Sequence, residues 1–126
     1  MAVVMRGWVD GSGREAILPL TVIGRSGVPT EVETTVDTGF TGSLCLPLDI
    51  VRSLSAPFVG RGMAVLADGS TVETSYHRAR VIWHGREHTI NVLVTAGSPL
   101  VGMTLLRGSI LTVAVSPSGE VAIEEA

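Results

Sequence analysis

The strongest constraint on the fold is a series of short runs rich in β-branched residues, each bounded by residues that form turns. Runs of this length and composition are typical of strands, and most of the segments between them are short enough for hairpins. We therefore expect an all-β, antiparallel domain with strands near residues 2–9, 15–24, 30–36, 61–67, 70–83, 87–95, 109–115 and 120–124. The turn signals are Asp10-Gly11-Ser12-Gly13, Arg25-Ser26-Gly27, Asp68-Gly69, His84-Gly85-Arg86 and Pro117-Ser118-Gly119.

Two short helices are expected beside the strands, one over residues 47–54 and one over residues 103–107. Pro47 suits a first helical position, because the N–H that proline lacks would have no helical partner there, and Gly108 suits the residue after a helix end. The 126 residues contain no internal repeat, low-complexity segment or linker. We therefore expect a single domain over residues 1–126.

Composition and charge exclude several classes of function. The net charge is −3 and no run of basic residues occurs, so we expect no nucleic-acid partner. The chain has no lysine, which excludes Schiff-base catalysis and a P-loop, and Cys45 is alone, which excludes an internal disulfide. No stretch approaches the roughly 20 apolar residues of a membrane span, and no signal-peptide pattern is present. These features predict a cytoplasmic protein with no membrane partner.

One short motif carries chemistry. Asp37-Thr38-Gly39 follows the strand-like run 31–36, and it is followed by Phe40-Thr41-Gly42-Ser43 and the apolar Leu44-Cys45-Leu46. This arrangement resembles the catalytic loop of the aspartic peptidases, in particular the retroviral-type, single-domain branch called retropepsin-like. A tight turn after a strand is the alternative interpretation of the same three residues.

A second motif lies late in the chain, where Pro99-Leu100-Val101-Gly102-Met103-Thr104-Leu105-Leu106 resembles the apolar-apolar-glycine motif and short helix of that family. Between the two motifs the family has a hairpin flap, and the runs that meet at Asp68-Gly69 match its position. An ordinary hairpin turn is the alternative interpretation, and it is compatible with a flap. The resemblance covers nearly the whole chain and implies a closed-barrel retropepsin-like fold with a flap. The substrate-binding residues that it implies are Phe40, Thr41, Ala67, Asp68, Gly69, Val101 and Gly102.

The resemblance implies an aspartic endopeptidase that needs no cofactor and acts on a polypeptide. Hydrolysis of this kind requires one carboxylate to accept a proton from water and one carboxylic acid to protonate the carbonyl oxygen. Asp37 is the only aspartate followed by Thr-Gly, so the second carboxyl group would come from Asp37 of a second copy in a two-fold homodimer. Like charges about 3 Å apart cannot both ionise, so the pair would share one proton and work on the acidic side of neutral.

Some residues of this loop follow the family's pattern, and others depart from it. Gly39 allows a close backbone approach, and its N–H can donate a hydrogen bond to the carboxylate. By resemblance, Thr38 would hydrogen-bond across the dimer axis. Phe40 stands where the family usually has a small residue, which predicts a reshaped substrate pocket. Thr41 and Met103 stand where retroviral members have an acidic residue and its arginine partner, so no unpaired charge remains. The segment after Ile110 is long enough for a hairpin, which predicts a different dimer interface.

Two alternatives belong to other classes. The same fold could serve as a dimerisation or protein-interaction module with weak or no peptidase activity, because fold alone does not decide function. His84-Gly85-Arg86-Glu87-His88 matches the H-x-x-E-H pattern of inverted zinc peptidases, but that site needs a helix. A glycine inside the pattern and strand-like runs on both sides predict a hairpin loop, so no metal site is expected.

Overall fold

The computed structural model describes residues 3–65 and 68–126, and within them the chain is mainly β-structure. Each run expected as a strand corresponds to a strand, although β5 begins earlier than expected and residues 66–67 lie outside the described residues. The strands are β1 (Met5–Val9), β2 (Ala16–Ile23), β3 (Pro29–Val36), β4 (Leu44–Pro47), β5 (Phe58–Val65), β6 (Thr71–Trp83), β7 (Arg86–Thr95), β8 (Leu100–Val101), β9 (Ser109–Val113) and β10 (Glu120–Glu125).

Two of these strands, β4 and β8, were not expected, and they change the character of the sheet. β4 pairs in parallel with β7 and antiparallel with β8, while β8 pairs in parallel with β3. The expectation of a purely antiparallel domain is therefore wrong. Both strands lie inside the sheet, where an alternation of buried and exposed residues is not required, and Leu44, Cys45 and Leu46 of β4 are all buried.

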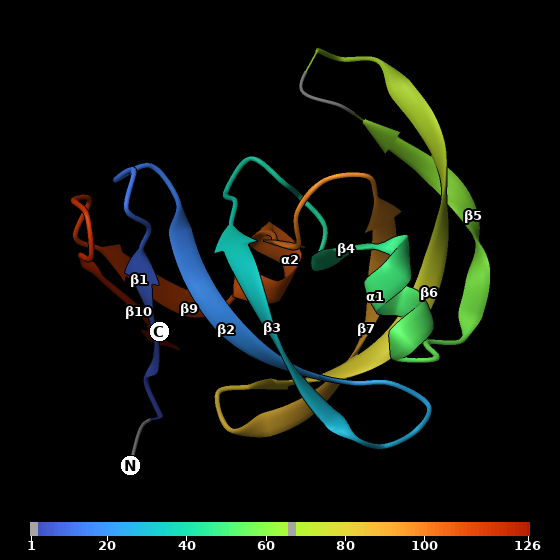
Figure 1. Cartoon of the computed structure of the whole chain (residues 1–126), viewed down its shortest axis with the longest axis horizontal. Coiled ribbons are helices and arrows are strands. Elements are labelled where there is room, and N and C mark those ends of the chain that lie inside the picture. Colours follow the sequence, from blue (N-terminus) through green and yellow to red (C-terminus); the bar gives the residue numbers. More distant parts are fainter. Residues whose placement is uncertain (1–2, 66–67) are drawn as a thin grey trace.

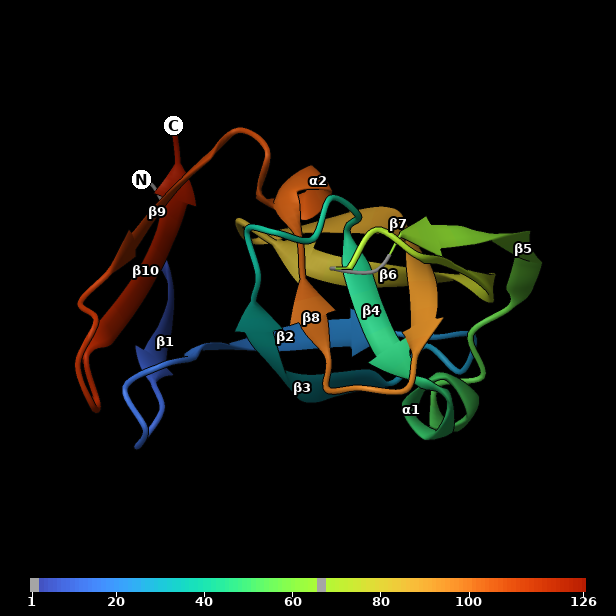
Figure 2. The ribbon, with the colours of Figure 1, turned by 90° about the horizontal axis from the view of Figure 1, so that it is seen from above.

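In the part of the chain that the structure describes, six strands follow one another in a closed ring, in the order β2, β3, β8, β4, β7 and β6. The ring closes because β2 pairs back onto β6, with Val22 opposite Val81 (Figure 1). β5 extends the sheet from β6, and the two form a hairpin that reaches beyond the ring. On the other side β1, β10 and β9 form an extension at one end of the molecule, where both termini also lie (Figure 2). The expected all-β fold is thus confirmed.

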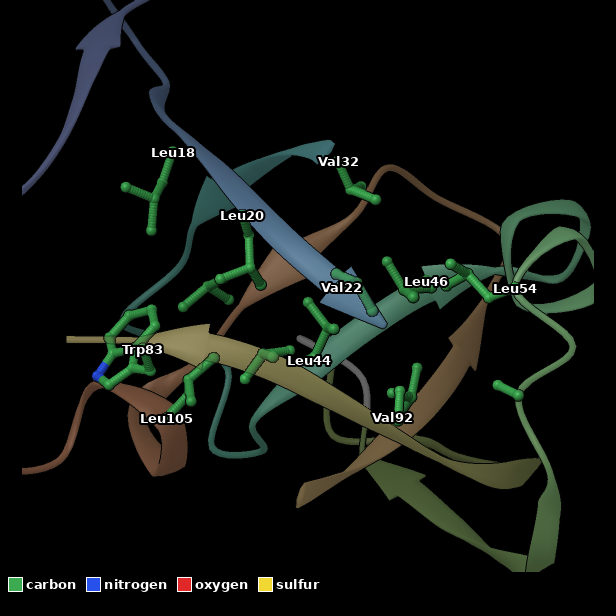
Figure 3. Packing of buried hydrophobic residues seen from close by; sticks show 14 of the residues in the cluster. Leu18, Leu20, Val22, Val32, Leu44, Leu46, Leu54, Trp83, Val92 and Leu105 are labelled. Carbon is green, nitrogen blue, oxygen red and sulfur yellow. The ribbon is translucent and has the colours of Figure 1, made fainter. Parts of the chain in front are cut away.

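The ring encloses the hydrophobic core. Alternate residues of β2 point inward, so that Leu18, Leu20 and Val22 are at most 1% exposed. Figure 3 shows Trp83 and Leu105 at one end of the cluster and Leu54 at the other. Each fully buried side chain of this size contributes about 1.5–3 kcal/mol to folding, so the ring is a firm support for the loops at its rim.

The two short helices that the sequence predicts are present, and buried residues at both join the core. In α1 (Leu48–Ser53) the residue Pro47 is the extended N-cap, so it lies just before the first helical position rather than in it. α2 (Met103–Leu106) ends before Gly108, whose φ of +80° is readily adopted only by glycine. Among the described residues, no helix is long and apolar enough to cross a membrane.

The segment that matches the zinc-peptidase pattern is a hairpin turn. His84 and Gly85 have φ values of +52° and +76°, and they join the antiparallel strands β6 and β7. The Nε2 atom of His84 lies 2.8 Å from Oγ of Ser109, whereas His88 is an exposed residue of β7. The interpretation as a hairpin loop is confirmed, and the two histidines do not share a helical face. Within residues 3–65 and 68–126, no group of three or more His, Cys, Asp or Glu side chains could hold a metal ion.

Candidate active site

Asp37 begins the loop that leaves β3, and main-chain hydrogen bonds hold this loop in place. The N–H of Asp37 donates to the carbonyl oxygen of Val101 in β8 (2.9 Å), and the N–H of Phe40 donates to the carbonyl oxygen of Asp37 (3.1 Å). The N–H of Gly39 donates to the Oδ1 atom of the Asp37 carboxylate (2.9 Å). Asp37 is half-buried, while Thr38 and Gly39 are exposed at the tip of the loop. The carboxylate is therefore held in a fixed direction by backbone groups.

The rest of the loop is attached to the N-terminal end of α2. The N–H of Met103 donates to the carbonyl oxygen of Phe40 (2.8 Å), and the N–H of Thr104 donates to the carbonyl oxygen of Gly42 (3.2 Å). The hydroxyl of Thr104 also donates to the carbonyl oxygen of Thr41. At the positions where the retroviral pattern has an ion pair, this chain thus connects the same two segments by hydrogen bonds between neutral groups.

Gly102 allows this close attachment. A Cβ atom on Gly102 would lie 2.3 Å from the carbonyl oxygen of Gly42 and 2.6 Å from that of Phe40, which is closer than non-bonded atoms can approach. Val101, the preceding residue, is 0% exposed. Val101 and Gly102, predicted as substrate-binding residues, therefore lie beneath the loop, where they support it, and do not line the cavity above.

A cavity of about 1200 Å³ lies between this loop and the hairpin of β5 and β6. Of the predicted site residues, Asp37, Gly39, Phe40 and Thr41 line it. The volume exceeds that of a usual small-molecule pocket, which is about 300–1,000 Å³. The cavity is large enough for several residues of an extended peptide. Its lining also includes residues of the hairpin, of β7 and of β4, among them Met63, Glu73, Thr74, Tyr76, Asn91, Leu93 and Cys45.

The hairpin has the position expected of a flap. Its turn contains Gly69, with a φ of +84°, and Asp68, whose Oδ1 atom accepts hydrogen bonds from the N–H (2.9 Å) and the hydroxyl (2.6 Å) of Ser70. The hydroxyl of Ser70, more than any other group, lowers the pKa of Asp68 from its usual value. Asp68 and Gly69 are exposed at the turn and do not line the cavity in this single chain. Ala67, also predicted as a site residue, lies outside the described residues.

Several residues that line the cavity were not anticipated from the sequence. Tyr76 lies on β6 with its ring over Gly62 of β5, so that a Cβ atom on Gly62 would lie 2.2 Å from Cε2 of Tyr76. Glu73, on the same strand, forms an ion pair with Arg61, with 2.7 Å between Oε1 of Glu73 and Nη1 of Arg61. The alternation of β6 does not predict this lining, because the successive residues Val72, Glu73 and Thr74 all line the cavity.

Cys45 also lines the cavity, although it is only 4% exposed. Burial, and after it the negative charge of Asp37, raises the pKa of the Cys45 thiol to about 11. The thiol is thus held in its neutral form close to Asp37. A buried, neutral thiol of this kind is a structural residue rather than a nucleophile.

No protein-family model and no curated protein sequence matches this chain. Solved structures do match. EIAV protease in complex with the inhibitor HBY-793 aligns with a TM-score of 0.61 and 18% identity, over 75% of this chain and 86% of that chain. A retropepsin-like aspartic protease from Rickettsia conorii aligns with a TM-score of 0.60 and 14% identity, over 99% of this chain and 94% of that chain. Together with the ring of strands and the flap-like hairpin, these alignments show that the chain has the all-β retropepsin-like fold.

Proposed function

We propose that this protein is an aspartic endopeptidase that acts as a homodimer, with Asp37 of each subunit contributing to one active site. The observation that carries the proposal is the position of Asp37 on a loop fixed by backbone hydrogen bonds, at the wall of a large cavity beneath a hairpin. The fold is shared with proteins described as proteases, which supports the same reaction class.

The need for a second subunit follows from the chemistry of the cavity. Peptide hydrolysis by carboxyl groups needs one base that accepts a proton from water and one acid that protonates the carbonyl oxygen. Besides Asp37, the cavity wall carries Glu73, but that carboxylate is on the hairpin and is bonded to Arg61. A second Asp37 across a two-fold axis supplies the missing acid. Thr38 and Gly39 are exposed at the loop tip, so they are accessible to a partner loop.

The substrate that fits this cavity is an extended polypeptide. The walls carry apolar side chains such as Met63, Leu93 and Leu100, and strands of the hairpin form one side. An extended chain bound against strands makes main-chain hydrogen bonds, while its alternating side chains enter pockets of either wall. We therefore propose cleavage within a polypeptide chain.

A peptide-cleavage assay tests the proposal. A mixed peptide library is incubated between about pH 4 and 7, the range suited to a pair of carboxyl groups that share one proton. The wild type, Asp37→Asn and the matched control Asp49→Asn are compared, since Asp49 is an exposed residue of α1 outside the cavity lining. We expect cleavage by the wild type and by Asp49→Asn, and at least about a 100-fold loss in Asp37→Asn.

Two further measurements complete the assay. A metal chelator should leave cleavage unchanged, and sedimentation should show that the active species is a dimer. A wild type that is folded and dimeric but cleaves no peptide would contradict the proposal, and it would favour the alternative in which the fold is a protein-interaction module.

A further inference from the structure

The space beside Asp37 is shaped by one aromatic side chain, that of Phe40. Phe40 lines the same cavity as Asp37 and belongs to the same loop. Its N–H donates to the carbonyl oxygen of Asp37 (3.1 Å), and its own carbonyl oxygen accepts from the N–H of Met103 (2.8 Å). The backbone of Phe40 is therefore fixed within the loop and against α2, and this fixes the point from which its ring projects.

Two glycines make room for the ring. A Cβ atom on Gly42 would lie 2.5 Å from Cζ of Phe40, and a Cβ atom on Gly102 would lie 2.4 Å from Cδ2. The first contact is at the tip of the ring and the second is near its base. The ring thus fills the space that both glycines leave free, and the side chain is held along its length. A side chain packed in this way moves little when a ligand binds.

We propose that Phe40 determines substrate specificity, because its ring is the fixed wall of the pocket that receives the substrate side chain nearest the cleaved bond. The inference rests on the proposed peptidase function and adds a preference to it. With the ring in place, the pocket beside Asp37 accepts small and medium aliphatic side chains and excludes large aromatic ones. In a two-fold dimer each side of the cleaved bond meets one Phe40, so the preference applies to both flanking residues.

Two substitutions change this wall in opposite directions. Phe40→Ala removes the ring and widens the pocket. Gly42→Ala places a methyl group against the tip of the ring, and because Gly102 leaves no room at its base, the ring is displaced toward the cavity. Gly42 does not have a positive φ, so the added methyl group causes no backbone strain. In the double variant Phe40→Ala/Gly42→Ala the methyl group has no ring to displace, which makes it the matched control.

The measurement uses three peptides that are identical except for the residues on both sides of the cleaved bond, which are leucine, tryptophan or alanine. We expect Phe40→Ala to raise the ratio of kcat/KM for the tryptophan peptide over the leucine peptide by about 10-fold or more. Gly42→Ala should lower cleavage of the leucine peptide relative to an alanine peptide by about 10-fold. The double variant should match Phe40→Ala. Equal ratios in the wild type and Phe40→Ala would overturn the inference.

Binding to an inactive protein separates this inference from the proposed function. In the Asp37→Asn background, calorimetry compares binding of the leucine and tryptophan peptides with and without Phe40→Ala. We expect the ratio of affinities to shift by about 10-fold toward the tryptophan peptide. If the wild type cleaves neither peptide, the peptidase proposal fails, while a shifted ratio of affinities still supports the role of Phe40. An unchanged ratio, or no binding of either peptide, overturns that role. If Phe40→Ala does not fold, Phe40→Leu keeps an apolar side chain at this position and allows the same comparison.

Discussion

The N–H of Asp37 donates a 2.9 Å hydrogen bond to the carbonyl oxygen of Val101. Asp37 belongs to the first motif and Val101 to the second, far away in the sequence. The parallel pairing of β3 with β8 sets Val36, the residue before Asp37, opposite Val101. The carboxylate of Asp37 is thereby positioned by a strand and a helix from the other end of the chain. Changes around Gly102 should consequently alter both the stability of the fold and the geometry of the site.

Substitution of Gly102 by alanine should destabilise the protein by about 1–3 kcal/mol, because the new methyl group meets backbone atoms that cannot move aside. The nearest of these are the carbonyl oxygens of Gly42 and Phe40, at 2.3 and 2.6 Å. Urea unfolding measures the loss. Gly11→Ala is the control, since a Cβ atom there meets nothing within 4 Å and should change stability by less than about 0.5 kcal/mol. Equal unfolding midpoints for the two variants would contradict this view of Gly102.

The Cys45 thiol should be nearly inert in the folded protein. Burial, together with the charge of Asp37, raises its pKa from 9.0 to about 11, so the reactive thiolate is about 100-fold scarcer than in a free thiol. We expect iodoacetamide at about pH 8 to modify the native protein at least about 100-fold more slowly than the urea-unfolded protein. A native rate equal to the unfolded rate would show that the thiol is accessible.

Removal of the Ser70 hydroxyl should change the titration of Asp68. This hydroxyl is the main reason that the pKa of Asp68 lies below 3.8, so Ser70→Ala should raise it toward that value. A carboxyl whose pKa is lowered by folding stabilises the structure above its unfolded pKa, and this contribution is lost as the pH falls through the folded pKa. The turn should therefore stay intact above about pH 4 and weaken only below it.

A carboxyl-carbon NMR titration measures this effect. Asp10, whose pKa is lowered mainly by the hydroxyl of Ser12, serves as an internal reference that Ser70→Ala should leave unchanged. A titration of Asp68 that is identical in the wild type and Ser70→Ala would show that the hydroxyl does not hold the carboxylate.

Local sequence patterns predicted the longer strands of the sheet but missed the short strands β4 and β8. In β2, apolar residues recur at alternate positions because one face meets the core, and this period marks a strand. β4 has no such period, because Leu44, Cys45 and Leu46 are successive residues and all three are buried. β8 has only two residues, Leu100 and Val101, too few for any period. The parallel pairings of these strands depend on distant partners, which local patterns do not specify.

Some residues of the candidate site could likewise be predicted from the sequence, and others could not. Asp37, Phe40 and Thr41 could be placed at the cavity from a motif, since the loop that carries them is local in sequence. The hairpin residues that line the cavity could not, because they include successive residues of both strands, 63–65 and 72–74, and such runs have no period that marks a face.

The claim that two copies of Asp37 form one active site is tested most directly by mixing subunits. Wild-type and Asp37→Asn chains are refolded together in varied proportions at constant total concentration, and peptide cleavage is measured in each mixture. If both aspartates are required, activity follows the square of the wild-type fraction, because only dimers of two wild-type subunits are active. A linear decrease would mean that each chain acts with its own Asp37 alone, and it would contradict the shared site.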